Sequence, residues 1–570
     1  MGNAHDMHMG LVLQKEDKCT KLKMAILEII EAFSITDYLL IFALIFATYV
    51  FNFYYKYLTR PNPLHGPLPL PFIGNLHNMI FDLRSFYCKC QPNYGDICEI
   101  MFDGSRCIIL SRPEYIEKLM STCARRLPYY QGLDELGFSR HGIAGNDVYE
   151  IWKYNRQFFD HVLVSPRFRD YTVKSIIKLF EELRWYWQSL GMQSVPNNKN
   201  KNNWTLETDI SEWFHAFANE TISVIVTSER TYSIASYYNM QSTVKHEYSD
   251  ALVEDGNKFV KALVDHIQAL TFFMLVGKFL RHYVPIIKDM ANFYLKNRDY
   301  IYEKLDRIIK TRREKIEAMP VGTEMGSDML TSLITLNTEK DTDTAKIKTM
   351  DGMTYEPMPD EEIRSNLLEA IGGGSDSTGN TFCYITYYVC KHPNVKQKMI
   401  SEIDSVFSKN SNISYLTRDD LLKLKYCEAI INEALRMIPV TNIVTRHMTE
   451  ECEIAGYKWA PGTVFHINLA GVHSHPEVWP NPEVFDPDRF YNVDQDDKRL
   501  KNKYSLVTFG GGLRICPGRK LAMTQLLLWM SSVYRYYNVE LVNMHEPLKI
   551  HSLSANNVPE LKVRISPRIN

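Results

Sequence analysis

Near its C-terminal end the chain reads Phe509-Gly-Gly-Gly512-Leu-Arg514-Ile-Cys516-Pro517-Gly518-Arg519. The three consecutive glycines allow unusual backbone angles and the close approach of a flat ligand, because no Cβ intrudes. Pro517 suits the first position of a helix, and the largely apolar run at 519–534 is helical in character. Cys516 would then lie at a helix N-terminus, where the helix dipole stabilises a thiolate. Such a thiolate can ligate a metal or act as a nucleophile, and the residues alone leave both open.

The fixed positions of this stretch resemble the cysteine loop of the cytochrome P450 family, F-x-x-G-x-R-x-C-x-G. The matching residues are Phe509, Gly512, Arg514, Cys516 and Gly518. From average residue usage, a chance match in a chain this long is on the order of one in ten thousand. The resemblance implies that Cys516 binds the iron of haem b (iron protoporphyrin IX) and that Arg514 pairs with a haem propionate.

Residues 361–390 read as one long helix with Ala370-Ile-Gly372-Gly373-Gly374-Ser375-Asp376-Ser377-Thr378 at its middle. Each glycine costs about 1 kcal/mol in a helix relative to alanine, so three together suggest a local bulge or the close approach of a ligand. Asp376 and Ser377 could relay protons beside this weak point, and a surface-facing polar patch is the alternative. The stretch resembles the family's A/G-G-x-D/E-T motif, which implies a catalytic role for Asp376, Ser377 and Thr378. Serine replaces the usual threonine at position 377 and lacks the methyl group that restricts the rotamer.

Two further motifs follow in the family's order. Glu433-Ala-Leu-Arg436 places an acid and a base three residues apart on one helix face, and it resembles E-x-x-R. Phe485-Asp-Pro487-Asp-Arg489-Phe490 resembles P-x-R-F. The resemblance implies that Glu433, Arg436 and Arg489 form a structural charge cluster. Without the resemblance, Glu433 and Arg436 would be interpreted as an ordinary ion pair on a solvated surface.

Two arginines are further candidates for haem contacts. Trp152 and Arg156 resemble the family's W-x-x-x-R, whose arginine contacts a propionate. Arg446 occupies the place, after the E-x-x-R helix, where the family often has another propionate contact. The alternative for both arginines is an exposed or ion-paired side chain.

An uncharged apolar run lies near the N-terminus, at residues 38–55. A membrane span needs about 20 predominantly apolar residues, and the tyrosines at the ends of the run suit the headgroup layer. We therefore expect a single transmembrane anchor over residues 37–56, in preference to a cleaved signal peptide or a buried helix. Lys56 and Arg60 favour a cytosolic position for the chain after the anchor, although lysines before the run weaken that inference.

The anchor divides the chain into segments. Residues 1–36 form an N-terminal extension to which we assign no function. Residues 57–72 are rich in proline, which fixes φ, and predict a stiff hinge. Residues 73–570 would form the catalytic domain. Its long helical stretches and short extended runs predict a mainly α fold with small β-sheets (α+β), as in the cytochrome P450 family.

The composition narrows the function further. A formal net charge of −2 gives no basic footprint for nucleic acid. The 11 cysteines are odd in number and show no disulfide framework, which favours a reducing, cytosolic compartment. No flavin or nicotinamide fingerprint is fused to the chain. The resemblance therefore implies a separate NADPH-dependent cytochrome P450 reductase as electron donor.

The combined interpretation is a haem-thiolate monooxygenase on the endoplasmic reticulum, with its catalytic domain in the cytosol. It would insert one oxygen atom from O₂ into an apolar small-molecule substrate and release the other as water. Membrane access and apolar pockets favour an apolar substrate. Two alternatives remain open. They are a haem-thiolate isomerase or dehydratase that acts on peroxides without a reductase, and a non-catalytic haem-binding protein.

Overall fold

The computed structural model describes residues 34–79, 82–102, 105–122, 131–193, 204–248, 256–341, 346–348, 352–407, 417–491, 502–552 and 555–568. The chain divides into two compact units, Met1–Leu64 and His65–Asn570. Most of the predicted extension at 1–36 lies outside the described residues, since the description begins at Ser34.

The described part of the first unit is dominated by helix α2, Ile35–Leu58. The helix begins with a capping box, in which Ser34 and Asp37 each accept a hydrogen bond from the other's backbone N–H. Its 24 residues give a length of about 36 Å, enough to cross a hydrocarbon core of about 30 Å. None of its residues is buried, and it is the one helix in the described ranges that is long and apolar enough to span a membrane.

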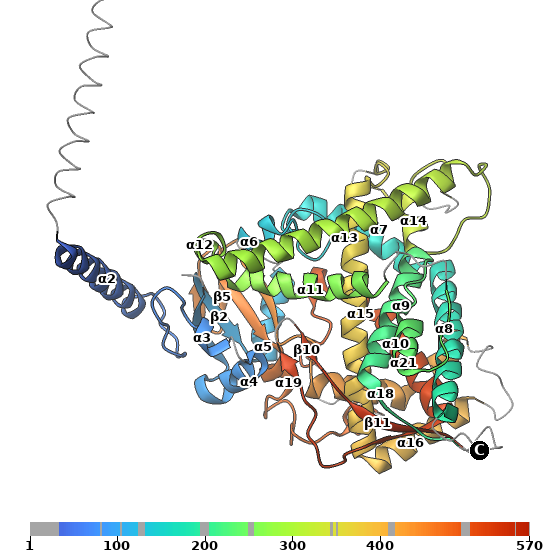
Figure 1. The fold of residues 1–570 in the computed structure, drawn as a ribbon. Helices are drawn as coiled ribbons and strands as arrows, with labels where there is room; N and C mark the ends of the chain where they lie inside the picture. Colours follow the sequence, from blue (N-terminus) through green and yellow to red (C-terminus); the bar gives the residue numbers. More distant parts are fainter. Residues whose placement is uncertain are drawn as a thin grey trace, which may run out of the picture. The chain divides into compact units, whose positions relative to one another are not determined.

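The second unit is mainly helical (Figure 1). Its helices are α3 (Leu76–Met79), α4 (Leu83–Tyr94), α5 (Pro113–Thr122), α6 (Gln131–Glu135), α7 (Tyr149–Val164), α8 (Pro166–Gln193), α9 (Ile210–Thr227), α10 (Ser233–Gln241), α11 (Gly256–Leu275), α12 (Lys278–Tyr283), α13 (Pro285–Glu317), α14 (Met329–Thr335), α15 (Asp360–Lys391), α16 (Pro393–Val406), α17 (Arg418–Leu421), α18 (Lys425–Met437), α19 (Leu469–His473) and α21 (Arg519–Tyr536). Short 3₁₀ turns lie at Pro487–Arg489 and Gly512–Arg514.

The strands form small sheets, as predicted for a mainly α fold. They are β1 (Ile97–Phe102), β2 (Ser105–Leu110), β3 (Leu206–Asp209), β4 (Ile443–His447), β5 (Cys452–Ile454), β6 (Tyr457–Trp459), β7 (Val464–Asn468), β8 (Tyr537–Leu541), β9 (His551–Ser552), β10 (Asn556–Asn557) and β11 (Lys562–Pro567). The largest sheet has the order β1-β2-β7-β4, in which β2 and β7 run parallel and the other neighbours antiparallel. The pairing of β4 with β7 places Arg446 opposite Phe465.

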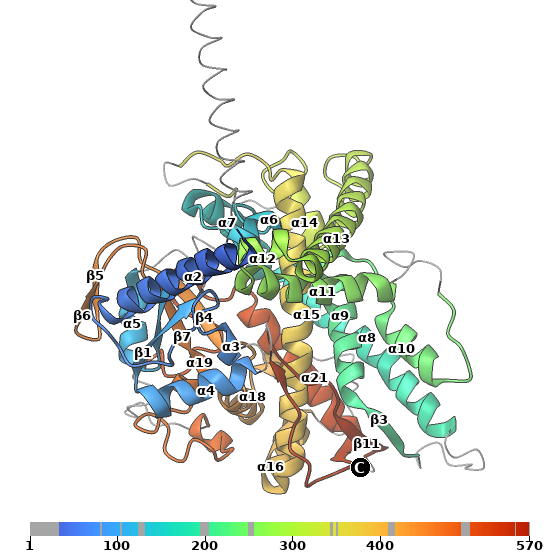
Figure 2. The ribbon, with the colours of Figure 1, turned by 60° about the vertical axis from the view of Figure 1, so that its left-hand side comes forward.

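Helix α15 runs through the helical part of the second unit, with α9 and α21 packed against it (Figures 1 and 2). Acidic residues fill its first turn and Lys391 its last, which suits the helix dipole. Aromatic rings join the three helices, since Phe382 of α15 lies 4.4 Å from Phe214 of α9 and 5.3 Å from Trp529 of α21, between centroids. This core holds α15 rigidly beside the loop that carries Cys516.

Candidate active site

A closed backbone turn presents Cys516. The N–H of Cys516 donates to the carbonyl of Phe509 at 2.9 Å, which ties the two ends of the glycine-rich stretch together. Gly512 has a φ of +64°, and a Cβ there would overlap the carbonyl of Met120, so only glycine fits. Helix α21 begins at Arg519 with Gly518 as its N-cap, two residues later than the predicted start at Pro517. Cys516 therefore precedes the helix, and its side chain is exposed to a cavity.

That cavity has a volume of about 400 Å³ and is bounded by the cysteine loop, α15, α7 and β4. Its wall is largely apolar, with three hydroxyl groups on α15 and three arginines. The lining includes Ile143, Ala144, Trp152, Arg156, Ile222, Glu369, Gly373, Ser377, Thr378, Thr381, Arg446, Phe509, Arg514, Cys516, Gly518 and Gln525. The structure thus gathers predicted residues that are separated by more than 300 positions in the sequence.

The glycines of α15 give the cavity room. The helix is continuous from Asp360 to Lys391, so the predicted bulge is absent from it. A Cβ on Gly373 would meet nothing within 4 Å, whereas one on Gly374 would press on Ile222 of α9. The open space at Gly373 leaves room for a ligand, and close helix packing accounts for Gly374. Ser377 donates its hydroxyl hydrogen to the carbonyl of Gly373 at 2.7 Å, on the same side as the cavity.

Thr378 and Asp376 occupy different surroundings. Thr378 is buried, lines the cavity and donates to Oε1 of Gln525 at 3.4 Å. Asp376 does not line the cavity, and its carboxylate lies 3.7 Å from Nδ1 of His215 on α9. Burial raises the pKa of Asp376, and His215 opposes that rise. No sequence motif pointed to His215, because a single histidine on an apolar helix is usually part of a core.

The three arginines are anchored by neighbours in the protein. Arg514 stacks over the indole of Trp152, 4.0 Å from the ring centroid, and donates to the carbonyl of Ile143 at 3.4 Å. Arg156 donates to the carbonyl of Ile515 at 2.8 Å and to Asp160 at 2.7 Å. Arg446 is buried and donates to the carbonyl of Thr445 at 2.8 Å. Trp152 thus supports Arg514 directly, a contact that its spacing from Arg156 did not reveal.

Glu433, Arg436 and Arg489 come together outside the cavity, in a buried cluster. Glu433 accepts from Nε of Arg436 at 2.7 Å and from its Nη2 at 2.8 Å. Nε of Arg489 lies 3.4 Å from the same carboxylate. Arg436 also donates to the carbonyl of His473 at 2.9 Å, which joins α18 to α19.

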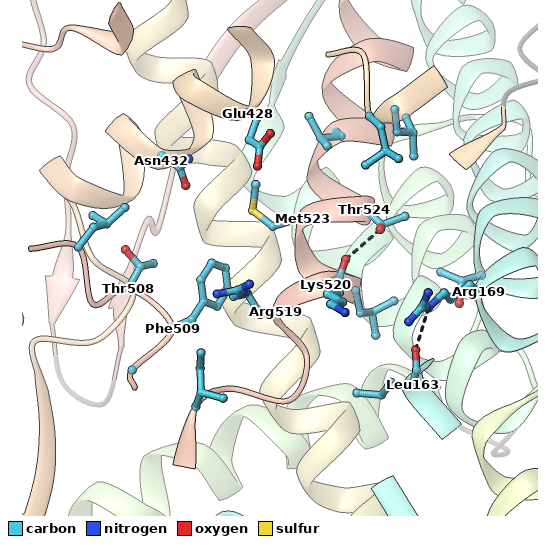
Figure 3. Close-up of a pocket in the computed structure, with 18 of the residues that line it drawn as sticks. Leu163, Arg169, Glu428, Asn432, Thr508, Phe509, Arg519, Lys520, Met523 and Thr524 are labelled. Atoms are coloured by element: carbon cyan, nitrogen blue, oxygen red, sulfur yellow. Dashed lines mark hydrogen bonds between the residues drawn. The ribbon is translucent and has the colours of Figure 1, made fainter. Parts of the chain in front are cut away.

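A second, larger hollow of about 790 Å³ borders the same cysteine loop, as Figure 3 shows. It shares Thr508, Phe509, Ile515 and Leu521 with the cavity, so the loop separates the two spaces. Its basic lining residues are Arg169, Arg418, Lys503, Arg519 and Lys520. We call this hollow the basic groove. Burial and the nearby charge of Arg418 lower the pKa of Arg169, as expected where like charges face each other.

The cavity residues fit a haem group. An iron ion favours a soft thiolate ligand, and Cys516 supplies a thiol at one wall. A flat apolar ring needs apolar walls and a surface without side chains, which the open face of Gly373 provides. The two propionates need cationic partners, and Arg156, Arg446 and Arg514 line the same space.

Comparison with known proteins agrees with this geometry. A family model described as Cytochrome P450 matches residues 64–565. The chain is similar to "Cytochrome P450 3A12" of Canis lupus familiaris, at 25% identity over 92% of this chain and 95% of that protein. It is also similar to "(+)-vincadifformine 19-hydroxylase" of Catharanthus roseus, at 24% identity over 84% and 86%. A solved cytochrome P450DA heme domain shares the fold, with a TM-score of 0.69 and 18% identity over 89% of this chain and 98% of that one. The chain belongs to the cytochrome P450 family, and its cofactor is haem.

Proposed function

We propose that this monooxygenase hydroxylates an apolar small molecule, using electrons that a separate NADPH-dependent reductase delivers. One observation carries the proposal. The thiol of Cys516 and the hydroxyls of Ser377 and Thr378 line a single, largely apolar cavity. The relative named as a 19-hydroxylase supports the reaction type.

Cys516 is the proposed iron ligand, and the turn closed by its N–H fixes the direction of its sulfur. Arg156, Arg446 and Arg514 are the proposed partners of the propionates. When bound, haem supplies the activation of O₂ and the insertion of one oxygen atom into a C–H bond, with the other leaving as water. Phe509, Gly512 and Gly518 shape the loop, while Glu433, Arg436 and Arg489 hold the fold behind it.

Proton delivery is the proposed task of α15. Ser377 and Thr378 carry hydroxyls at the cavity, where each can accept a proton from one side and donate to the other. Asp376 lies on the neighbouring helix face beside His215, which is partly exposed. This pair would take protons from solvent and pass them to the hydroxyls through water.

The basic groove is the proposed docking site for the electron donor. Among the described residues, five cationic side chains line it, against the single carboxylate of Glu428. An acidic face on a flavoprotein would complement that charge and speed association. Because the groove and the cavity share the cysteine loop as a wall, a donor seated there would lie close to the loop that carries Cys516, the proposed iron ligand.

Two features would place the protein on a membrane. Helix α2 is the proposed anchor, covering the predicted 37–56, and residues 57–72 are the proposed hinge to a catalytic domain at 73–570. On α12 and α13 a row of exposed apolar side chains recurs every three or four residues, at Phe279, Tyr283, Ile286, Met290 and Phe293. Phe279 and Tyr283 lie four residues apart on α12, and Ile286, Met290 and Phe293 follow at intervals of four and three residues on α13, so each helix presents an exposed apolar face that suits a lipid surface. Lys56 and Arg60 favour a cytosolic position for the catalytic domain, and the proposed membrane is that of the endoplasmic reticulum.

The first test is the reduced, carbon-monoxide-bound absorption spectrum of the full-length protein and of Cys516→Ala. We expect a Soret band at the long-wavelength position of thiolate ligation, lost in the variant. Cys452→Ala is the matched control, because Cys452 is a partly exposed cysteine that does not line the cavity. A histidine-type spectrum that is unchanged in Cys516→Ala would refute the ligand assignment.

The second test measures NADPH consumption and substrate hydroxylation with a P450 reductase present and absent. The proposal predicts that both depend on the reductase and on O₂. Conversion of a lipid hydroperoxide without reductase would instead indicate an isomerase or dehydratase. A thiolate-type spectrum without turnover of any class of substrate would indicate a non-catalytic haem protein.

A further inference from the structure

Two carboxylates of α15 hold a loop that the sequence motifs do not include. Glu362 accepts from the N–H of Gly142 at 3.1 Å, and its other oxygen lies 2.7 Å from Nδ1 of His141. Glu369, seven residues further along the helix, accepts from the N–H of Ile143 at 2.7 Å and of Ala144 at 2.9 Å. Three successive backbone amides therefore bind to two side chains of one helix. We call residues 141–146 the clamped loop.

The fit between the loop and the helix is tight. Gly142 has a φ of +63°, which favours glycine. A Cβ there would also lie 2.7 Å from the carboxylate of Glu369, so both the backbone angle and the lack of space exclude a larger residue. Asn155 of α7 donates to Glu362 at 2.7 Å, and Asn366 donates to Oδ1 of Asn155 at 2.5 Å. The carboxylate of Glu362 is thus satisfied by a buried network. Hydrogen bonds to an ionised acceptor of this kind are stronger than neutral ones.

The clamped loop is a wall of the active-site cavity. Ile143 and Ala144 line the cavity, and so does Glu369, while Glu362 lies behind the wall. The carbonyl of Ile143 accepts from Nη1 of Arg514, one of the proposed propionate partners. The position of this wall therefore depends on two acids of α15 and connects directly to the cysteine loop.

We propose that Glu362 and Glu369 are positioning residues that set the shape of the substrate cavity by clamping residues 141–146. This inference rests on the proposed function, because it concerns the cavity in which the substrate would bind. Glu362 lies behind the cavity wall, and Glu369, which lines the cavity, acts in the proposal through the loop that it holds. They fix the backbone that presents Ile143, and a fixed wall lowers the entropy cost of binding a ligand that touches it.

The direct test is amide hydrogen exchange in the haem-loaded, full-length protein. Glu369→Gln removes the charge and one of the two acceptor oxygens. We expect the amides of Ile143 and Ala144 to exchange at least about tenfold faster, since hydrogen bonds to charged groups are among the stronger ones. Asp360→Asn is the matched control, because Asp360 is exposed on the same helix and pairs with Arg313 at 3.0 Å, not with the clamped loop. Equal exchange in both variants would overturn the clamp.

A second measurement tests whether the clamp shapes the cavity. Imidazole and 4-phenylimidazole bind haem iron through the same nitrogen, and the shift of the Soret band reports their Kd. We expect Glu369→Gln to weaken 4-phenylimidazole about tenfold and imidazole less than about twofold, because only the larger ligand reaches the wall. Faster exchange with an unchanged Kd for both ligands would show a clamp without influence on the cavity and would overturn the proposal. An equal change for both would do the same.

The carbon monoxide spectrum distinguishes a failure of the clamp proposal from a failure of the proposed function. Without a thiolate-type spectrum in the wild type the proposed function fails, and hydrogen exchange still decides whether the carboxylates hold the loop. If Glu369→Gln loses its haem, Glu362→Gln replaces it, because Glu362 does not line the cavity. The expected result is then faster exchange of the amide of Gly142, with the same selective loss of 4-phenylimidazole binding.

Discussion

The buried charge cluster behind the cysteine loop gives a prediction with a defined magnitude. Glu433 is fully buried and accepts from two nitrogens of Arg436, at 2.7 and 2.8 Å, and from the N–H of Asp486 at 2.9 Å. Arg489 approaches the same carboxylate at 3.4 Å. Glu433→Gln keeps the shape of the side chain but leaves two buried guanidinium groups without their counter-charge.

Removing one partner of a buried ion pair costs about 3–5 kcal/mol. The free energy of unfolding of most domains is only about 5–15 kcal/mol. Glu433→Gln should therefore lose about a fifth or more of the stability, although Glu433 lies outside the haem cavity. The assay is the amplitude of the thiolate-type carbon monoxide spectrum during urea denaturation, from which the midpoint and the free energy are obtained.

Glu428→Gln is the matched control for this experiment. Glu428 lies on the same helix, α18, and pairs with Lys425 at 3.4 Å, where both side chains are exposed. Exposed pairs contribute about 0–1 kcal/mol, so this variant should behave like the wild type. If Glu433→Gln lost no more stability than Glu428→Gln, the cluster would not hold the fold, and its assignment as structural would be wrong.

Three further predictions address protons, pH and the electron donor. Ser377→Ala should lower the ratio of product to NADPH consumed at least about tenfold, because proton transfer by a positioned group contributes about 10²–10⁴, and an unchanged ratio would refute its role. Burial lowers the pKa of His266 from 6.5 to about 4. Between pH 6.5 and pH 4, His266 is therefore protonated in the unfolded chain but neutral in the folded chain. The free energy of unfolding consequently falls as the pH drops from 6.5 toward 4. His266→Leu should retain about 2 kcal/mol that the wild type loses between pH 7 and pH 5, measured by urea denaturation at both values. Arg519→Glu in the basic groove should raise the KM for reductase about tenfold at low ionic strength, with a smaller effect at high salt, and a salt-independent change would contradict electrostatic docking.

Motifs with fixed spacing allowed much of the site to be predicted. The pattern around Cys516 identified the loop, and the cavity contains the thiol, the glycine of α15 and the three arginines that the resemblance implied. Glu433 and Arg489 meet although 56 positions separate them in the sequence. Such contacts are predictable because a resemblance carries the three-dimensional arrangement with the motif. Neither composition nor periodicity contains that information.

Contacts made by the backbone could not be predicted in this way. The clamped loop lies more than 200 positions before Glu362, and its donors are backbone amides, which almost every residue possesses. The only local trace was Gly142, a single glycine among many. The contact of His215 with Asp376 could not be predicted for a related reason, because the two residues lie on different helices. The start of α21 at Arg519 also differed from the prediction, because Pro517 was compatible with a helix start but did not require one.

One face of α15 carries polar residues and a glycine along most of its length. Glu362, Asn366, Glu369, Gly373 and Ser377 recur at intervals of three or four residues, so they form a single stripe along the helix. A helix buried in a core would normally present apolar side chains there. Here each polar member is bound by the clamped loop, by α7 or by the helix backbone, and the glycine leaves room for haem. The stripe therefore joins the loop wall, the space for the cofactor and the hydroxyl proposed to carry protons on one helix, and an apolar residue that would stabilise an isolated helix should damage the site at any of these five positions.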